Sequence, residues 1–172
     1  MYRIGDNVLY GAHGVCRIAA KEERTVDKKS VEYFVLEPLN QSGARFLVPS
    51  HNPAAMAKLR PIMTKKEIDA LLCSPEIATD VWIADENQRK QCYRALITSG
   101  DCIGLLRMVK TLYRHRQEQL TAGKRLHLCD ENFLRDAQKL LDSEFSLVLG
   151  LEPDMIKNYL LSHMNSDDII PE

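Results

Sequence analysis

His13 and Cys16 are the residues whose types and spacing come closest to catalytic chemistry. His13 lies in a turn between Gly11 and Gly14, and Cys16 follows three positions later, so the imidazole could act as the base for a thiol nucleophile. A turn histidine with structural hydrogen bonds is the more common alternative. His127 and Cys129 are two apart on a predicted helix, so they face different directions and cannot bind one metal ion together. Since no nucleotide-binding loop, hydrolase elbow or zinc-protease motif occurs either, we expect no enzymatic activity, cofactor or metal site.

Phosphate binding is the chemistry that the charge distribution favours. The net charge is only −1, but residues 89–125 contain nine basic and two acidic residues. Residues 131–172 contain nine acidic and three basic residues. Such an asymmetry within one chain is typical of contact with nucleic acid. The alternative is a solvated helix face, which explains isolated basic residues better than a nearly acid-free segment.

Composition limits the class of protein. The 172 residues are 45% apolar and 27% charged, as in an ordinary globular protein. No apolar run approaches 18 residues and no basic-then-apolar leader is present, so we expect neither a membrane span nor a secretory signal. The five cysteines stand singly, without a C-x-x-C pair. This favours reduced thiols and a cytoplasmic location.

The first third of the chain has the alternating pattern of short β-strands. Strands are predicted at residues 7–10, 15–20, 31–37 and 44–48, separated by glycine-rich and polar turns. Pro49 ends the last of them, because it cannot donate a hydrogen bond to a sheet. We therefore predict a small antiparallel SH3-like or Tudor-like β-barrel over residues 1–61.

The rest of the chain, residues 62–172, has helical periodicity. Thr64 and Glu67 form a capping box at the start of the first helix. Further helices are predicted from the early 80s to Thr98, over Cys102–Gln119, over an apolar series from Leu126 to Phe145 capped by Thr121, and over Pro153–Leu161. The predicted class is α+β, with a β-barrel domain followed by an all-helical domain.

The glycine-rich amino-terminal segment resembles a known family pattern. That pattern, G-D-x-V-x-Y-P-x-H-G-V-G-x-I, is found in the CarD family of bacterial transcription regulators and in the related polymerase-binding module of the transcription–repair coupling factor. The matching positions are Gly5, Asp6, Val8, Tyr10, His13, Gly14, Val15 and Ile18. Gly11 replaces the usual proline, and Cys16 replaces the usual glycine. Asn87–Lys90, Tyr93 and Ser99–Asp101 are also similar to CarD motifs, so the resemblance covers nearly the whole chain.

The resemblance implies that the barrel binds the β subunit of RNA polymerase. Family members use a basic residue after the second strand for this contact, and Arg24 stands at that position. A second basic residue usually lies on the last long strand, two before the proline, where this chain has Leu47. Arg45 is expected on the same face as Leu47, because strand side chains alternate, and could take over this function.

The resemblance also implies that the helical domain contacts promoter DNA. Family members carry a tryptophan near the start of the long helix, which acts as a wedge at the upstream edge of the melted bubble. Trp82 is the sole tryptophan, and it falls one helical turn before the usual position. The alternative is that Trp82 anchors the core. The other expected DNA contacts are Arg89 and Lys90, which could instead pair with Asp85 and Glu86 at i, i+4, and the helix face with Arg107, Lys110 and Arg114.

Together these features predict a non-enzymatic transcription regulator. It would bind the polymerase β subunit and promoter DNA near the −10 element with weak sequence preference, modulate the open complex, and be associated with the nucleoid. The alternative is a protein–protein adaptor of the transcription machinery that makes no direct DNA contact. A monomer is expected, although the leucine-rich helix from Leu126 leaves a dimer open.

Overall fold

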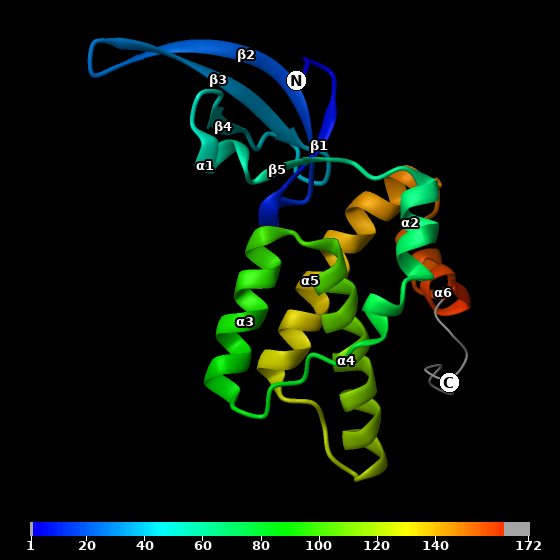
Figure 1. Cartoon of the computed structure of the whole chain (residues 1–172). Helices are drawn as coiled ribbons and strands as arrows, with labels where there is room; N and C mark the ends of the chain where they lie inside the picture. Colours follow the sequence, from blue (N-terminus) through cyan, green and yellow to red (C-terminus); the bar gives the residue numbers. More distant parts are fainter. Residues whose placement is uncertain (1, 164–172) are drawn as a thin grey trace. The chain divides into compact units, whose positions relative to one another are not determined.

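The chain divides into two structural units. The computed structural model describes residues 2–163 (Figure 1), and contacts within the chain separate Met1–Ile62 from Met63–Glu172. We call the first the sheet unit and the second the helical unit. A strand-rich first third followed by helices confirms the predicted α+β class, and it fits a Tudor-like domain with a helical carboxy-terminal part.

The sheet unit is one antiparallel sheet of five strands. Its strands are β1 (Asn7–Tyr10), β2 (Val15–Val26), β3 (Lys29–Pro38), β4 (Phe46–Pro49) and β5 (Leu59–Pro61). They are ordered β4-β3-β2-β1-β5 across the sheet, with the short helices η1 (Gly11–His13) and α1 (Pro53–Met56) in the connections. No alternating pattern predicted β5, which has only three residues and is placed by its pairing with β1.

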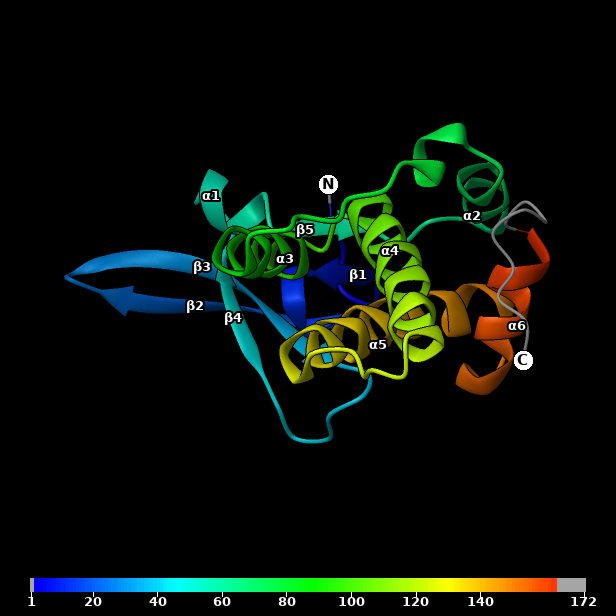
Figure 2. The same cartoon turned by 90° about the horizontal axis from the view of Figure 1, so that it is seen from below.

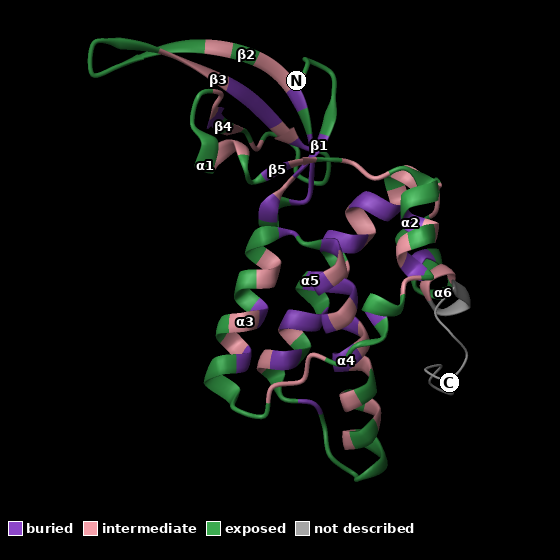
Figure 3. Ribbon diagram, viewed as in Figure 1, coloured by how far each residue is buried: buried purple, intermediate pink, exposed green. Residues whose placement is uncertain are grey.

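The β2–β3 hairpin extends further than the sequence pattern predicted. Asp27 and Lys28 both have positive φ angles, 50° and 65°, as the two central residues of a type I′ turn require. The turn therefore needs only two residues, and the strands continue to Val26 and from Lys29. The end of the hairpin projects beyond the strands that flank it, and it is mostly exposed (Figure 3).

One face of the sheet carries a compact apolar core. Its buried members are Val8, Cys16, Ile18, Phe34, Leu36, Val48 and Leu59. A β-bulge between Ile18 and Ala20 shifts the register of β2, so odd-numbered β2 residues face this side beyond it. Lys21 accordingly lies over the ring of Phe34, with its ammonium 4.9 Å from the ring centre.

The helical unit is built on two long helices that pack against each other. Its elements are α2 (Lys65–Leu72), η2 (Pro75–Ala78), α3 (Glu86–Ser99), α4 (Cys102–Thr121), α5 (Leu128–Leu149) and α6 (Pro153–His163). Helices α4 and α5 lie side by side, and α3 packs on both (Figure 2). Among the helices of the described region, none is long and apolar enough to cross a bilayer.

The helix ends show where local sequence signals decide the structure. The capping box of Thr64 and Glu67 is confirmed, and Asp101 caps α4 by accepting from the Gly104 amide at 3.0 Å. The predicted cap at Thr121 is wrong, since Thr121 is the last residue of α4. Helix α5 begins only after His127, which makes no side-chain capping bond.

We expect Asp142 on α5 to make the stability of the helical unit depend on pH. Burial, and second the nearby Asp154 carboxylate, raise the pKa of Asp142 to about 6, compared with about 3.9 in an unfolded chain. Between these values the folded state binds more protons, so stability falls as the pH rises from about 4 to 6. We expect Asp142→Asn to stabilise the unit against urea at pH 8 and to make no difference below about pH 4. The exposed Asp136→Asn on the same helix is the control, and equal stability of Asp142→Asn and wild type at pH 8 would refute the effect.

Candidate functional site

The residues predicted to contact polymerase gather on the sheet face opposite the core. In the register of the sheet, Arg24 lies opposite Val31 and Leu47 lies opposite Val35. Side chains alternate along β3, so Val31 and Val35 lie on the side of the sheet away from Phe34. Arg24 and Leu47, which are opposite them in the register, lie on that same side. Val31 and Val35 are four residues apart along β3, which places Arg24 and Leu47 about 13 Å apart along the strand direction.

Two arginines on this face are paired with carboxylates of the same sheet. Arg24 contacts Glu22 at 2.9 Å, and Arg45 contacts Glu37 at 3.0 Å. Both arginine side chains are more than half exposed, and Leu47 between them is 36% exposed. Exposed ion pairs contribute little free energy, so a carboxylate of a binding partner can replace either internal partner. We call Arg24, Arg45 and Leu47 the arginine face.

His13 of η1 and Cys16 of β2 both have structural surroundings. Cys16 is fully buried, and burial raises the pKa of its thiol to about 11, so the thiolate needed for nucleophilic attack does not form near neutral pH. The His13 ring stacks on Tyr10, with ring centres 5.2 Å apart, and lies tilted against Phe46, with ring centres 4.1 Å apart. These contacts favour the structural alternative over a catalytic pair. Within residues 2–163, no three His, Cys, Asp or Glu side chains are grouped to hold a metal ion.

Trp82 lies on an irregular segment before α3, and its predicted position on a helix is wrong. The Asp85 side chain accepts a hydrogen bond from the Gln88 amide at 2.8 Å and caps α3, so the helix begins at Glu86. Residues 79–85, which we call the Trp82 strap, run along α4 instead.

Side chains of α4 hold this strap in place. The contacts are a hydrogen bond from Arg107 to the Thr79 carbonyl at 3.4 Å, one from the Val81 amide to Thr111 at 3.1 Å, and an ion pair between Arg114 and Asp80. Positions 107, 111 and 114 share one face of the helix. Two of the three basic residues predicted on a DNA-contacting face thus also position the strap that carries Trp82.

The indole of Trp82 is half-buried, which matches neither of the two predicted environments completely. It packs against the core of the helical unit, yet it remains partly accessible to solvent. The His115 ring stacks on it, with ring centres 3.7 Å apart and planes 26° from parallel. The guanidinium carbon of Arg89 lies 4.2 Å from the ring centre.

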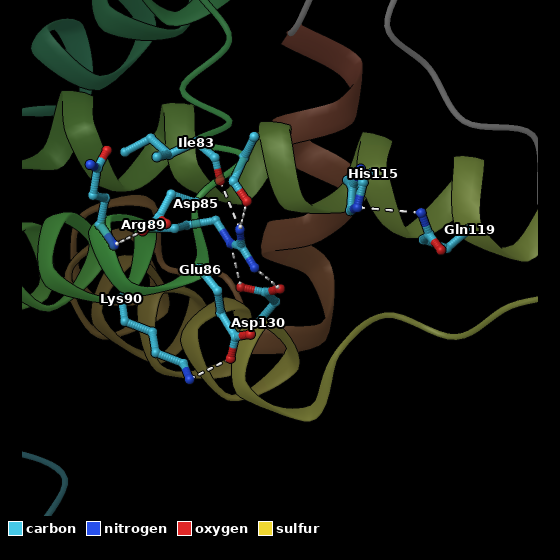
Figure 4. A network of polar contacts seen from close by, with 10 residues as sticks. Ile83, Asp85, Glu86, Arg89, Lys90, His115, Gln119 and Asp130 are labelled. Carbon is cyan, nitrogen blue, oxygen red and sulfur yellow. Dashed lines mark hydrogen bonds and ion pairs between the residues drawn. The ribbon is translucent and has the colours of Figure 1, made fainter.

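Arg89 is one of the most buried charged residues of the described chain. Two of its nitrogens donate to the two carboxylate oxygens of Asp130, each at 3.0 Å, and a third donates to the Ile83 carbonyl at 2.7 Å (Figure 4). The side chains of Arg89 and Asp130 are 6% and 2% exposed, and the Asp130 carboxylate raises the pKa of Arg89. A phosphate could reach this guanidinium only by displacing Asp130. Arg89 therefore pairs with Asp130 and not with Asp85, the pair that was one alternative from the sequence. A DNA contact of Arg89 stays a prediction.

Lys90 and Lys110 differ from Arg89 in their exposure. Lys90 pairs with Glu86 one helical turn away, as one of the two sequence alternatives predicted, and this pair lowers the pKa of Glu86 (Figure 4). Lys110 lies on α4 between the two arginines that hold the strap, and it is half-buried. Solvent reaches both lysines, and a phosphate contact of either one stays a prediction.

Two family models match this chain, one on each structural unit. The CarD-like/TRCF RID domain matches residues 2–63, and the CarD C-terminal domain matches residues 76–161. The chain belongs to the CarD family. A protein of Bacillus subtilis (strain 168) named "Putative transcription factor YdeB" is 23% identical over 159 residues, which cover 92% of this chain and 99% of that protein.

Membership of the CarD family makes the chain a transcription regulator that interacts with RNA polymerase. The matched families are regulatory and do not define an enzyme class. In CarD terms, the arginine face lies in the RID domain, and the Trp82 strap lies in the carboxy-terminal domain.

Sequence reasoning missed three residues of the Trp82 site: Asp130, His115 and Thr111. Asp130 had a usable signal, since it shares a helix face with Phe133, Leu134 and Ala137, and an acidic residue on an apolar face predicts a buried ion pair. Nothing in the sequence indicates that its partner lies 41 residues away. In the sequence, Thr111 and His115 look like ordinary polar residues of α4, because their contacts depend on how the strap packs on that helix.

Proposed function

We propose that this CarD-family chain binds the β subunit of RNA polymerase with its sheet unit and promoter DNA near the −10 element with its helical unit. By binding the open promoter complex more tightly than the closed one, it shifts the equilibrium toward the open state. Its site of action is the nucleoid in the cytoplasm. The polymerase contact follows from the family, whereas the β subunit, the DNA contact and the effect on the open complex are our proposals.

The observation that best supports the DNA contact is the way in which the structure holds Trp82. A half-buried indole is fixed on a strap, and basic residues of α4 lie beside that strap. A flat apolar side chain can hold a distorted base step, while basic side chains bind the flanking phosphates without reading sequence. The arrangement supports wedge-type binding with weak sequence preference.

A second candidate function is an adaptor that makes no DNA contact. It is favoured by one observation, namely that Arg107 and Arg114 already have internal partners in the strap. In an adaptor, these arginines would serve only the fold of the helical unit. Salt dependence separates the two functions, because phosphate contacts release counterions and a protein contact of this kind does not.

Arg24→Glu is expected to weaken binding to the polymerase β subunit while leaving the fold intact. The substitution reverses an exposed charge on the arginine face and breaks only the exposed pair with Glu22. Affinity for the purified β subunit can be measured by biolayer interferometry. Lys21→Glu is the matched control, because it makes the same charge change three residues away on the opposite face of β2. Equal affinities of both variants and wild type would remove Arg24 from the interface.

Replacing Arg107, Lys110 and Arg114 by glutamine is expected to reduce DNA affinity similarly for all sequences. The slope of log affinity against log salt should flatten by about one for each phosphate that the variant no longer binds. Fluorescence anisotropy with a labelled promoter duplex at several salt concentrations measures this slope.

The matched control neutralises Arg135, Lys139 and Lys157, the three basic residues after residue 130. It removes the same amount of charge from α5 and α6, where acidic residues predominate, and should leave the slope nearly unchanged. If both triple variants have the wild-type slope, the basic face of α4 is not a phosphate site and the adaptor function is favoured.

A further inference from the structure

Both faces of the Trp82 indole are occupied. His115 stacks with its ring centre 3.7 Å from the indole centre, and the Arg89 guanidinium lies 4.2 Å from it. Two flat groups this close to one ring centre cannot share a single face without overlapping, so they lie on opposite faces. What solvent reaches is therefore the edge of the indole.

Each of the two flanking groups is itself held by further contacts. Asp130 fixes the plane of the Arg89 guanidinium through two hydrogen bonds, as only a bidentate arginine pair can. On its own helix, the His115 ring contacts Glu118 at 3.3 Å. It also contacts Gln119 at 3.4 Å (Figure 4). We call Arg89, His115 and the indole between them the Trp82 sandwich.

We propose that Arg89 and His115 are positioning residues that fix the Trp82 side chain in one rotamer and present its edge to DNA. This inference rests on the proposed function, and it specifies how the wedge works. A base cannot stack on the face of an indole that is covered on both sides, so the contact is made by the rigid indole edge against a distorted base step. Because the rotamer is fixed before binding, little side-chain entropy is lost when DNA is bound.

The inference can be tested in the 172-residue chain, because Trp82 is its sole tryptophan and its fluorescence reports only this site. His115→Ala uncovers one face of the indole. We expect acrylamide to quench the Trp82 fluorescence of the free protein faster. We also expect an open-complex lifetime about two- to tenfold shorter than with wild type, because the loss of one ring stack corresponds to a factor of that size. His115→Phe retains a flat ring and should restore both values.

His127→Ala is the matched control, since this exposed histidine precedes α5 and is not part of the sandwich. If His115→Ala does not fold, His115→Gln makes the same comparison, because it removes the ring and retains a polar side chain. Wild-type quenching in a folded variant without the ring would show that His115 does not cover Trp82. Faster quenching with an unchanged open-complex lifetime would show that the sandwich does not position Trp82 for DNA. Quenching is measured without DNA, so it tests the sandwich independently of the proposed function. If the proposed function is wrong, the wild-type protein itself will leave the open-complex lifetime unchanged.

Discussion

Asp130→Ala is expected to lower the free energy of unfolding of the helical unit by about 3–5 kcal/mol. The substitution leaves the Arg89 guanidinium buried without its carboxylate, in a position only 5% exposed to solvent. Removing one partner of a buried ion pair costs this much because the remaining charge cannot recover its hydration. Urea denaturation followed by far-ultraviolet circular dichroism measures the change.

Two further variants show whether the cost comes from the unpaired charge. The double variant Arg89→Met/Asp130→Leu should recover much of the stability, because apolar residues of similar size replace a buried pair at little cost. Glu86→Ala, which breaks the exposed pair with Lys90, should change stability little. An Asp130→Ala protein as stable as wild type would mean that the Arg89–Asp130 pair does not hold the helical unit together.

Trp82→Ala is expected to remove the effect of the protein on open-complex lifetime while preserving its binding to polymerase. In the proposed mechanism the wedge contacts the melted DNA, and the arginine face of the other unit is proposed to contact polymerase. Since Trp82 is half-buried, its loss should cost less than the about 3–5 kcal/mol typical of a fully buried tryptophan. Lifetimes are measured by challenging preformed open complexes with heparin at equal concentrations of folded protein.

The control for this variant is Leu128→Ala. Leu128 is the most exposed large apolar residue of the described chain, at 72%, so its truncation removes apolar surface without disturbing the strap. It should leave the open-complex lifetime at the wild-type value. A Trp82→Ala protein that is strongly destabilised but gives a normal lifetime per folded molecule would identify Trp82 as a core anchor.

Much of the fold was predictable because its signals are local. Thr64 and Glu67 define a helix start within four residues, and Asp101 does the same for α4. The strands of the sheet unit alternate clearly enough to be recognised, although Asp27 and Lys28 adopt positive φ angles usually associated with glycine or asparagine. The start of α3 was misplaced because the apolar spacing from Trp82 onward continues the helical period through the Asp85 cap.

The Trp82 site was less predictable because its contacts join residues that are distant in the sequence. The periodicity identified Arg89 as a basic residue on a helix, but it could not show that Asp130 on α5 neutralises it. Likewise, the positions of Arg107 and Arg114 on one helix face suggested a phosphate-binding surface. Their internal contacts with Thr79 and Asp80 depend on how the strap packs on α4, which no spacing rule describes.

The lifetime of open promoter complexes tests the central claim most directly. Purified polymerase is allowed to open a promoter with and without a saturating concentration of the full chain, and decay is followed after heparin challenge. The proposed function predicts a longer lifetime with wild-type protein, and a lifetime close to that of polymerase alone with Trp82→Ala. An unchanged lifetime at saturating wild-type protein, with polymerase binding demonstrated in the same sample, would contradict it.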